Sequence, residues 1–351
     1  MGTRSCRLWG PMALAVILGG LTNCTVPSPD NQNRPASTPL SSVASSPQGL
    51  RVVVTTTILC DLTRRIAAST IDLTCLLKPG LDGHVYGATP ADRKAIEDAQ
   101  LILYSGYDFE PSLIKLIKAT SNPAVKVAVA EKAIPKPLLG EAQDHGHGHE
   151  EAEPGEKDEV AAKVPDPHVW QNAENGAQMV RVIQTELSQL VPEQANLYSQ
   201  NAQTLEAELT QIHRWIKAQI ATIPPSARKL VTTHDAMEYY ATAYNIPVKG
   251  ALQGISTEEK PSAGRIRELV ENVKASQVPT IFVEIVVNPK LIEAVAREAG
   301  VKVSDRALFS DSLGEPESGA STYVTMMIAN TQTIVEGLGG KFTPFQPKAT
   351  P

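Results

Sequence analysis

Short strand-like runs alternate with helical segments along most of this chain, and this alternation constrains the fold more than any other feature. The run Arg51–Thr57 is strand-like and the next segment, Ile58–Ala68, is helical. The alternation stops near residue 130 and restarts after Pro225. Repeated β–α units predict parallel sheets covered by helices. Further strands are expected at 72–78, 101–106, 125–130, 229–233, 247–252, 280–285 and 302–307, and further helices at 91–100, 110–120, 235–244, 262–276, 289–299 and 321–338.

A long helical stretch separates the two alternating regions. Apolar residues between Leu205 and Ile223 recur at steps of three or four, which makes one apolar stripe. A helix from Pro192 to Ile223 would be about 48 Å long and could join two lobes as a stiff rod. We place the remaining histidine of this stretch, His213, on the helix surface.

These patterns predict an α/β fold of two (β/α) lobes with mainly parallel sheets, joined by a long backbone helix. A chain of 351 residues is long enough for two domains. The expected divisions are an N-terminal lobe at 50–172 with an acidic His-rich loop at 141–163, linking helices at 173–223, a C-terminal lobe at 224–342 and a tail at 343–351.

The first 24 residues have the arrangement of an export signal. Arg4 and Arg7 precede a short apolar run, which is too short to span a membrane. The run ends in Leu-Thr-Asn-Cys, which resembles a lipoprotein signal with Cys24 as the lipidated residue, although Asn23 is unusual there. Residues 25–49 are rich in Pro and Ser and predict a flexible tether. We expect an exported protein, either periplasmic or lipid-anchored on the outer face of the cytoplasmic membrane.

Two cysteines remain in the expected folded part, Cys60 and Cys75. An exported protein meets an oxidising environment, so the two residues could form a disulfide. We nevertheless expect two buried thiols, one at a helix start and one in a strand.

The net charge of −6 argues against a nucleic-acid partner, since nucleic-acid binders usually carry a basic face. The chain has neither a Walker-type phosphate loop nor a Gly-x-Gly-x-x-Gly motif after a strand. A nucleotide site is therefore not expected.

Histidine is the commonest metal ligand, and the seven histidines of this chain fall into distinct groups. Three stand far apart, at His84, His168 and His234, each beside an expected strand end or helix start. Ligands of open α/β sheets bind beyond the carboxyl ends of the strands, where Glu284 and Asp311 are also expected. Three imidazoles and one carboxylate suit Zn²⁺, Mn²⁺ or Fe²⁺. A second group crowds into the acidic loop: His145, His147 and His149.

Each of these residues also has an ordinary interpretation. A single loop histidine is more often a hydrogen-bonded surface residue than a ligand, and Asp311 could simply belong to a turn. The argument for a metal site rests on the coincidence of their positions. The loop histidines are interpreted as an accessory low-affinity metal site, with a dispensable solvated insertion as the alternative.

Several stretches resemble the solute-binding proteins of bacterial zinc and manganese ABC importers, the ZnuA/TroA-like group. They include Asp-Gly-His-Val-Tyr at 82–86, Asp-Pro-His at 166–168, Thr-His-Asp-Ala at 233–236 and Ser-Asp-Ser-Leu at 310–313. The resemblance covers most of residues 50–340. It implies a metal held in the cleft between the lobes, an ABC permease with its ATPase as partners, and a protein that we expect to be a monomer. It implies that His84, His168, His234 and Asp311 are the metal ligands and that Glu284 lies next to the ligands without binding the metal. The chain departs from the family pattern at Gly83, where a Pro is more usual before the first His.

The predicted function is therefore zinc capture and delivery without catalysis. Histidine as the third ligand favours zinc, and the carboxylate of Asp311 leaves manganese, or iron, as the alternative. Less favoured are a zinc hydrolase, for which no His-Glu-x-x-His motif is present, a metal-dependent adhesin, and a periplasmic metal buffer without a transporter.

Overall fold

The computed structural model describes residues 49–141, 163–258 and 260–348, all within one unit that spans residues 47–351. The expected export signal, almost all of the tether and the three histidines of the acidic loop lie outside the described residues. Predictions about those segments therefore stay predictions.

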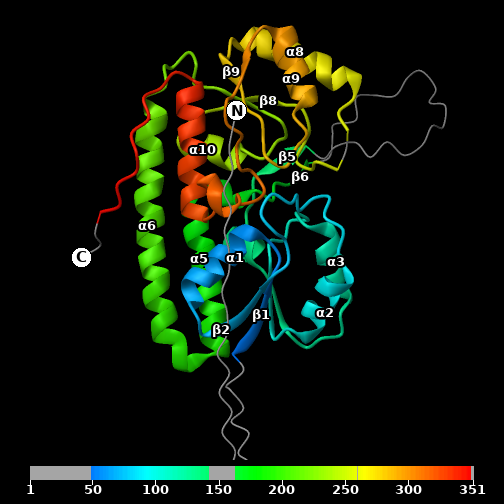
Figure 1. Ribbon diagram of the computed structural model, residues 1–351, viewed down its shortest axis with the longest axis vertical. Coiled ribbons are helices and arrows are strands. Elements are labelled where there is room, and N and C mark those ends of the chain that lie inside the picture. Colours follow the sequence, from blue (N-terminus) through cyan, green and yellow to red (C-terminus); the bar gives the residue numbers. More distant parts are fainter. Residues whose placement is uncertain (1–48, 142–162, 259, 349–351) are drawn as a thin grey trace, which may run out of the picture. The chain divides into compact units, whose positions relative to one another are not determined.

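The first half of the chain forms a four-stranded parallel sheet in the order β2-β1-β3-β4 (Figure 1). Successive side chains of the first strand, β1, point to opposite faces. Val52 and Val54 pack into the core shared with the long helices, whereas Val53 packs with Ile96 and Ile117. Both faces are thus covered by helices, which explains the three consecutive valines of this strand. The elements are β1 (Leu50–Val54), α1 (Thr57–Ala67), β2 (Ile71–Cys75), α2 (Pro90–Asp98), β3 (Leu101–Tyr104), α3 (Pro111–Ala119) and β4 (Val125–Ala128).

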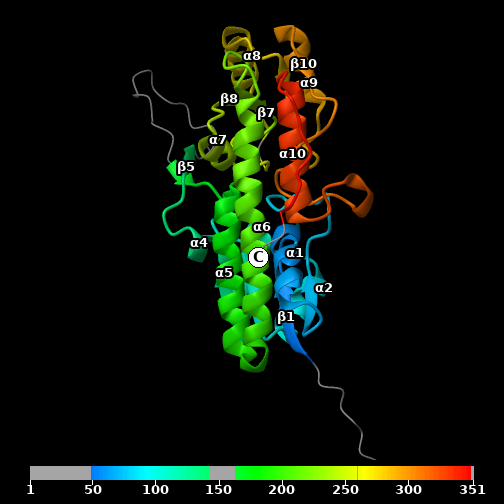
Figure 2. The same cartoon turned by 90° about the vertical axis from the view of Figure 1, so that its left-hand side faces the viewer.

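The predicted long helix is present as α6, Ala195–Ala221. Its 27 residues give a length of about 40 Å at 1.5 Å per residue. It is shorter than expected because residues 192–194 form a separate 3₁₀ turn, η2 (Pro192–Gln194). The apolar stripe is buried, and α6 packs along α5 (Ala173–Leu190), α1 and α10 (Tyr323–Gly337), as Figure 2 shows.

The second half of the chain repeats the β–α plan with shorter strands. β7 (Leu230–Thr232) pairs with β8 (Val248–Ala251), and β9 (Thr280–Ile281) pairs with β10 (Lys302–Val303), both in parallel. The amide of Phe282 donates to the Val231 carbonyl at 2.9 Å, which joins the two pairs. The helices are α7 (Glu238–Tyr244), α8 (Ala263–Ser276) and α9 (Lys290–Ala299), and a separate small core contains Val231, Leu252, Leu269, Val273, Ile281 and Ile292.

The predicted class, α/β with mainly parallel sheets and a long helix, is confirmed. The exception to parallel pairing among the described strands is a short hairpin, β5 (Leu139–Glu141) with β6 (Lys163–Pro165). α4 (Val129–Ala133) was not predicted, and a strand was expected over its first residues. The 3₁₀ turns η1 (Val169–Gln171) and η3 (Pro316–Ser318) were not predicted either. Elements this short lack a measurable period.

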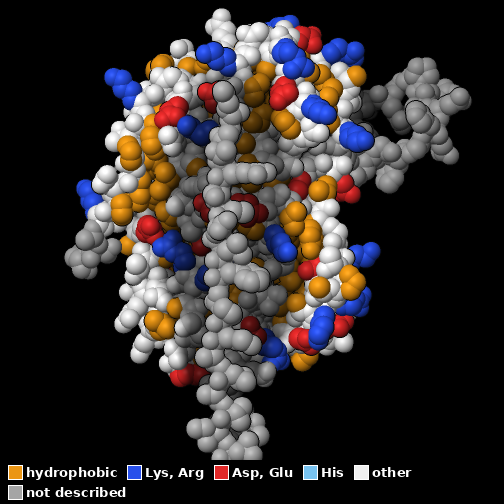
Figure 3. Space-filling view, viewed as in Figure 1, with side chains coloured by type: hydrophobic (Ala, Val, Ile, Leu, Met, Phe, Trp, Pro, Cys, Tyr) orange, Lys and Arg blue, Asp and Glu red, His pale blue; other side chains and the backbone are white. Residues whose placement is uncertain are grey.

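No helix among the described residues is both long and apolar enough to span a membrane. On the face shown in Figure 3, acidic and basic side chains are interspersed, and the basic ones do not gather into a single stripe.

The predicted state of the two cysteines is wrong, because Cys60 and Cys75 form a disulfide. β1 and β2 are parallel neighbours with Val54 opposite Cys75, and α1 begins just after β1. The first turn of α1 therefore lies beside the end of β2, and the Cα atoms stand 5.9 Å apart, within the usual disulfide range.

The predicted position of His213 on the helix surface is also wrong. The residue is 5% exposed, and its ring packs against Tyr244 of α7 with centroids 5.3 Å apart. Its Nε2 atom lies 3.5 Å from Glu174 Oε1 at the start of α5. His213 therefore faces a helix junction rather than solvent.

Reduction of the disulfide should lower the free energy of unfolding by about 3 kcal/mol, because the bridge closes a loop with a sequence separation of 15. Urea unfolding of the metal-free protein with and without a reductant measures this change. The control is the Cys60→Ala/Cys75→Ala double variant, whose midpoint should not respond to the reductant. An unchanged midpoint for the wild-type protein would contradict the prediction.

Candidate metal centre

Four side chains from four separate loops meet in the interior. His84 lies between β2 and α2, and His168 lies between β6 and η1. His234 follows β7 directly, and Asp311 lies between β10 and η3. Each is at most 5% exposed. His84, His234 and Asp311 lie beyond the carboxyl ends of parallel strands, where ligands of such sheets bind, and the β5–β6 hairpin brings His168 to them.

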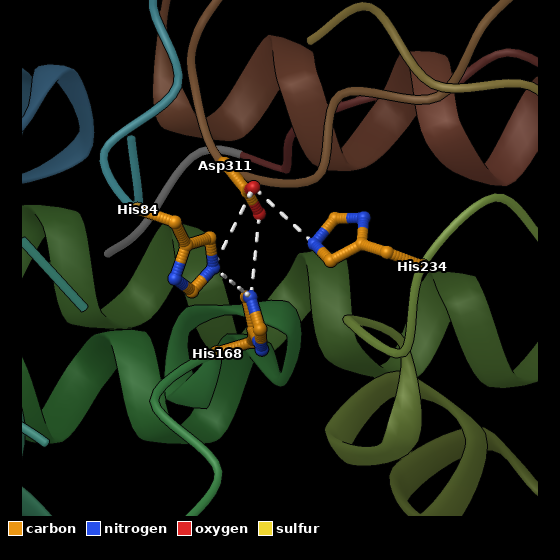
Figure 4. A group of neighbouring side chains, drawn as sticks. All are labelled: His84, His168, His234 and Asp311. Carbon is orange, nitrogen blue, oxygen red and sulfur yellow. Dashed lines mark hydrogen bonds and ion pairs between the residues drawn. The ribbon is translucent and has the colours of Figure 1, made fainter. Parts of the chain in front are cut away.

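The three imidazoles point toward the carboxylate, as Figure 4 shows. Asp311 Oδ2 lies 3.2 Å from His234 Nε2 and 3.8 Å from His84 Nε2, and Asp311 Oδ1 lies 3.4 Å from His168 Nε2. The Nε2 atoms of His84 and His168 are 3.2 Å apart. Within the described part of the chain, these are the residues whose possible ligand atoms, one from each, all lie within 4.8 Å of one another.

Two carboxylates contact the Nδ1 atoms of two of the imidazoles, on the side of each ring away from Asp311. Asp166 Oδ1 lies 2.8 Å from His168 Nδ1, and Glu284 Oε2 lies 2.5 Å from His234 Nδ1. Glu284 Oε1 also accepts from the amides of Thr233 and His234 at 2.8 and 2.9 Å. A carboxylate on Nδ1 fixes the ring orientation and leaves Nε2 for a metal ion.

The polar atoms of this cluster fit a cation. Both oxygens of Asp311 are buried, and their contacts with the three imidazoles, at 3.2–3.8 Å, are ion pairs that lack the alignment of hydrogen bonds. A buried carboxylate needs positive charge around it. A divalent ion among the three nitrogens and the carboxylate would satisfy all of these atoms together.

The loop of Asp311 is anchored to the first half of the chain. The Ser310 carbonyl accepts from Trp170 Nε1 and from Gln171 Nε2, both at 2.7 Å. The Leu313 amide donates to Thr57 Oγ1 at 2.9 Å. Asp311 is therefore flanked by residues fixed to η1, which directly follows His168, and to the start of α1.

An aromatic side chain fills the space beside two of the imidazoles. The ring of Phe109 lies edge-on to His84, with centroids 4.7 Å apart, and 6.0 Å from the ring of His168. A Cβ atom on Gly83 would lie 2.5 Å from Phe109. The glycine that replaces the usual proline before His84 thus allows Phe109 to approach closely.

The sequence analysis missed the roles of two aspartates that precede ligand candidates by two residues. Asp82 Oδ1 accepts from the His84 amide at 2.9 Å, and Asp166 Oδ1 accepts from the His168 amide at 2.9 Å. A short polar side chain that accepts from an amide two residues later stabilises a tight turn. The repeated Asp-x-His spacing was the signal that could have identified both.

The remaining candidate residues lie outside this group of four. Glu284 lies behind His234, where the sequence analysis expected it to lie behind the ligands. His145, His147 and His149 fall outside the described residues. The geometry brings His84, His168, His234 and Asp311 together, whereas their role as metal ligands stays a prediction.

Burial and the neighbouring charges lower the pKa of one imidazole and raise the pKa of the other two. Burial lowers the pKa of His84 to about 3, so that its ring is neutral. Burial also opposes the charge on His168, but Asp166 and the nearby Asp311 outweigh it and raise the pKa of His168 to about 9. Against the same burial, Asp311 and Glu284 raise the pKa of His234 well above its ordinary value. Burial alone would raise the pKa of Asp311, yet His234 and His168 hold it well below its usual range.

The family model for the periplasmic component A of the zinc-uptake complex, ZnuA, matches residues 52–337. The chain belongs to the ZnuA family. Members are periplasmic by description, so the expected location outside the cytoplasmic membrane is confirmed.

Relatives of the chain are named for two different metals. The manganese-binding lipoprotein MntA of Bacillus subtilis is 33% identical over 302 residues, which are 85% of this chain and 92% of MntA. The zinc-binding protein TroA of Treponema pallidum is 31% identical over 292 residues, which are 82% of this chain and 88% of TroA.

The solved structure of the periplasmic zinc-binding protein TroA from Treponema pallidum matches this fold with a TM-score of 0.72 and 29% identity. The match covers 83% of this chain and 99% of TroA, which confirms the predicted two-lobe architecture. The chain is a substrate-binding protein of the metal ABC transporter class.

Metal affinity should rise with pH between 5.5 and 7.5. The metal-free site carries protons on His168 and His234, whose pKa values are raised, and an imidazole must lose its proton to bind a metal ion. The apparent association constant should therefore rise by about tenfold per pH unit for each imidazole deprotonated. Competition titrations against a chelator, corrected for the protonation of the chelator, measure this dependence, and an affinity that is flat over the range would contradict it.

Proposed function

We propose that this protein captures Zn²⁺ outside the cytoplasmic membrane and delivers it to an ABC permease and its ATPase. The ligands are His84, His168, His234 and Asp311. Residues 1–24 direct export, Cys24 carries a lipid anchor, and the protein acts as a monomer. The observation that carries the proposal is the buried set of three imidazoles around a carboxylate, whose possible ligand atoms, one from each residue, all lie within 4.8 Å of one another.

The spacing of the ligand atoms supports zinc. Four ligands at about 2.0–2.1 Å around a tetrahedral ion stand about 3.3–3.4 Å apart. Four of the separations, taken over both oxygens of Asp311, are 3.2, 3.2, 3.4 and 3.8 Å, and the ligand atoms, one from each residue, all lie within 4.8 Å of one another, so the site is close to this size. Imidazole nitrogen also suits zinc better than it suits the harder Mn²⁺.

Manganese, or iron, is the second candidate. The carboxylate of Asp311 supplies oxygen ligands, and MntA of Bacillus subtilis, a relative with 33% identity, is named for manganese. Affinity for divalent ions follows a general order that favours zinc over manganese at almost any site. Binding strength alone therefore does not decide the ion that is transported.

The same geometry argues for binding without catalysis. A catalytic zinc site has three protein ligands and keeps a fourth position open for water. Here four protein ligands close the site, and two buried carboxylates that would otherwise be candidate bases are engaged with imidazole Nδ1 atoms. Neither a hydrolase nor an adhesin is needed to account for these residues.

One zinc ion per chain should bind tightly, and His234→Ala should weaken binding by more than about 100-fold. Loss of even an outer partner of a ligand costs about 10–100-fold, so Glu284→Gln should fall within that range. Chelator competition measures both variants. Unchanged affinity in His234→Ala would contradict the assignment, and measurable ester or peptide hydrolysis that is lost in the same variant would indicate an enzyme.

The His-rich loop can be removed without disturbing its base, because Glu141 and Lys163 are partners in the β5–β6 hairpin. Residues 142–162 should be replaced by Asn-Gly, which forms the two-residue turn that such hairpins favour. The shortened protein should keep one tight site. Loss of that site would show that the loop histidines hold the metal.

A further inference from the structure

Asp82 makes two hydrogen bonds that point in different directions. Its Oδ1 atom accepts from the amide of His84 at 2.9 Å, and its Oδ2 atom accepts from the hydroxyl of Thr257 at 2.5 Å. Asp82 belongs to the loop after β2, whereas Thr257 belongs to the loop after β8. The two residues are separated by 175 positions in the sequence. One carboxylate thus connects the backbone of a proposed ligand to the other half of the chain.

The loop of Thr257 is in turn tied to the strand end that carries His234. Gln253 Nε2 donates to the Thr257 carbonyl at 3.2 Å, and the Gln253 amide donates to the Thr233 carbonyl at 3.0 Å. The amide of Asp235 donates to the Gly254 carbonyl at 3.1 Å. A continuous hydrogen-bonded path therefore runs from His84 through Asp82 and Thr257 to the residues on either side of His234.

This path crosses between two separately packed cores. The loop of Asp82 starts at Leu76 and Leu77, which pack with Ile96 and Leu113 against the first sheet. The loop of Thr257 starts at Leu252, which belongs to the small core of α8 and α9. A movement that separates the two cores would act on the bond between Asp82 and Thr257 as well as on the distance between His84 and His234.

We propose that Asp82 and Thr257 are positioning residues that form a bridge across the metal cleft and slow the release of the ion. The proposal rests on the proposed function, since it takes His84 and His234 as ligands. The bridge holds the His84 amide in its turn and keeps the two cores together while the ion is bound. Release requires that this hydrogen bond break, so a transporter that separates the lobes acts on it directly.

The hydroxyl of Thr257 can be removed with little change in shape. Thr257→Val deletes the donor, and Thr257→Ser keeps it as the matched control. A hydrogen bond to a charged group contributes enough to change a rate constant by about tenfold. Thr257→Val should raise the zinc dissociation rate about 3–10-fold, because both partners are half-buried and water competes for the carboxylate.

The experiment measures zinc dissociation by stopped-flow transfer to an excess of a chromogenic chelator. Four proteins are compared with the wild type: Thr257→Val, Thr257→Ser, Asp82→Ala and the double variant Asp82→Ala/Thr257→Val. Faster release in Thr257→Val, wild-type release in Thr257→Ser, and no further effect of Thr257→Val in the Asp82→Ala background would support the bridge. A structural role of the methyl group alone would leave Thr257→Val unchanged.

Three results would overturn the proposal. They are a wild-type dissociation rate in Thr257→Val, equally fast release in Thr257→Ser, and a Thr257→Val effect of the same size when Asp82 is already alanine. A wild-type protein that binds no zinc would instead contradict the proposed function. In that case, amide hydrogen exchange of residues 79–86 in the metal-free protein decides on the bridge, since Thr257→Val should speed this exchange and an unchanged rate would rule the bridge out.

Discussion

The buried carboxylate of Asp311 is the constraint on which the rest of this structure depends. A fully buried charge is tolerated only when opposite charges or hydrogen-bond donors surround it. Asp311 is 1% exposed, and the groups that face it are the Nε2 atoms of three imidazoles that come from three other loops. Two of those imidazoles have carboxylates of their own behind them, Asp166 and Glu284. The arrangement leaves a place for one cation at its centre.

The fold supplies the rigidity that such a centre needs. β1 and β2 pair in parallel, as do β7 and β8, and the loops that carry His84 and His234 leave the carboxyl ends of β2 and β7. Helix α6 packs against α1 from the first half of the chain and against α10 from the second. The loop of Asp311 is fixed to Thr57, Trp170 and Gln171, all from the first half. The residues just before Asp311 are also bonded to the second half, where Leu308 pairs with Glu284 and Phe309 with Asn330, so Asp311 is tied to both halves of the chain.

The sequence predicted the fold and the candidate site because both follow from local patterns. The β–α alternation and the apolar stripe of α6 are periodic, and sparse histidines at strand ends converge once the sheets form. Other features depend on tertiary distances that have no periodic signal. The Cys60–Cys75 disulfide required the register of β1 with β2, and the burial of His213 required the position of α7. The hydrogen bond between Asp82 and Thr257 joins two loops whose approach no local pattern indicates.

The most direct measurement of the central claim is anomalous diffraction at the zinc and manganese absorption edges, on crystals of protein purified without added metal. The account predicts one strong peak whose signal disappears below the zinc edge. The peak should lie about 2.0–2.2 Å from the Nε2 atoms of His84, His168 and His234 and from the carboxylate of Asp311. A tightly bound ion without these residues around it would contradict the assignment, and a peak at this centre with the signature of manganese would contradict the choice of zinc.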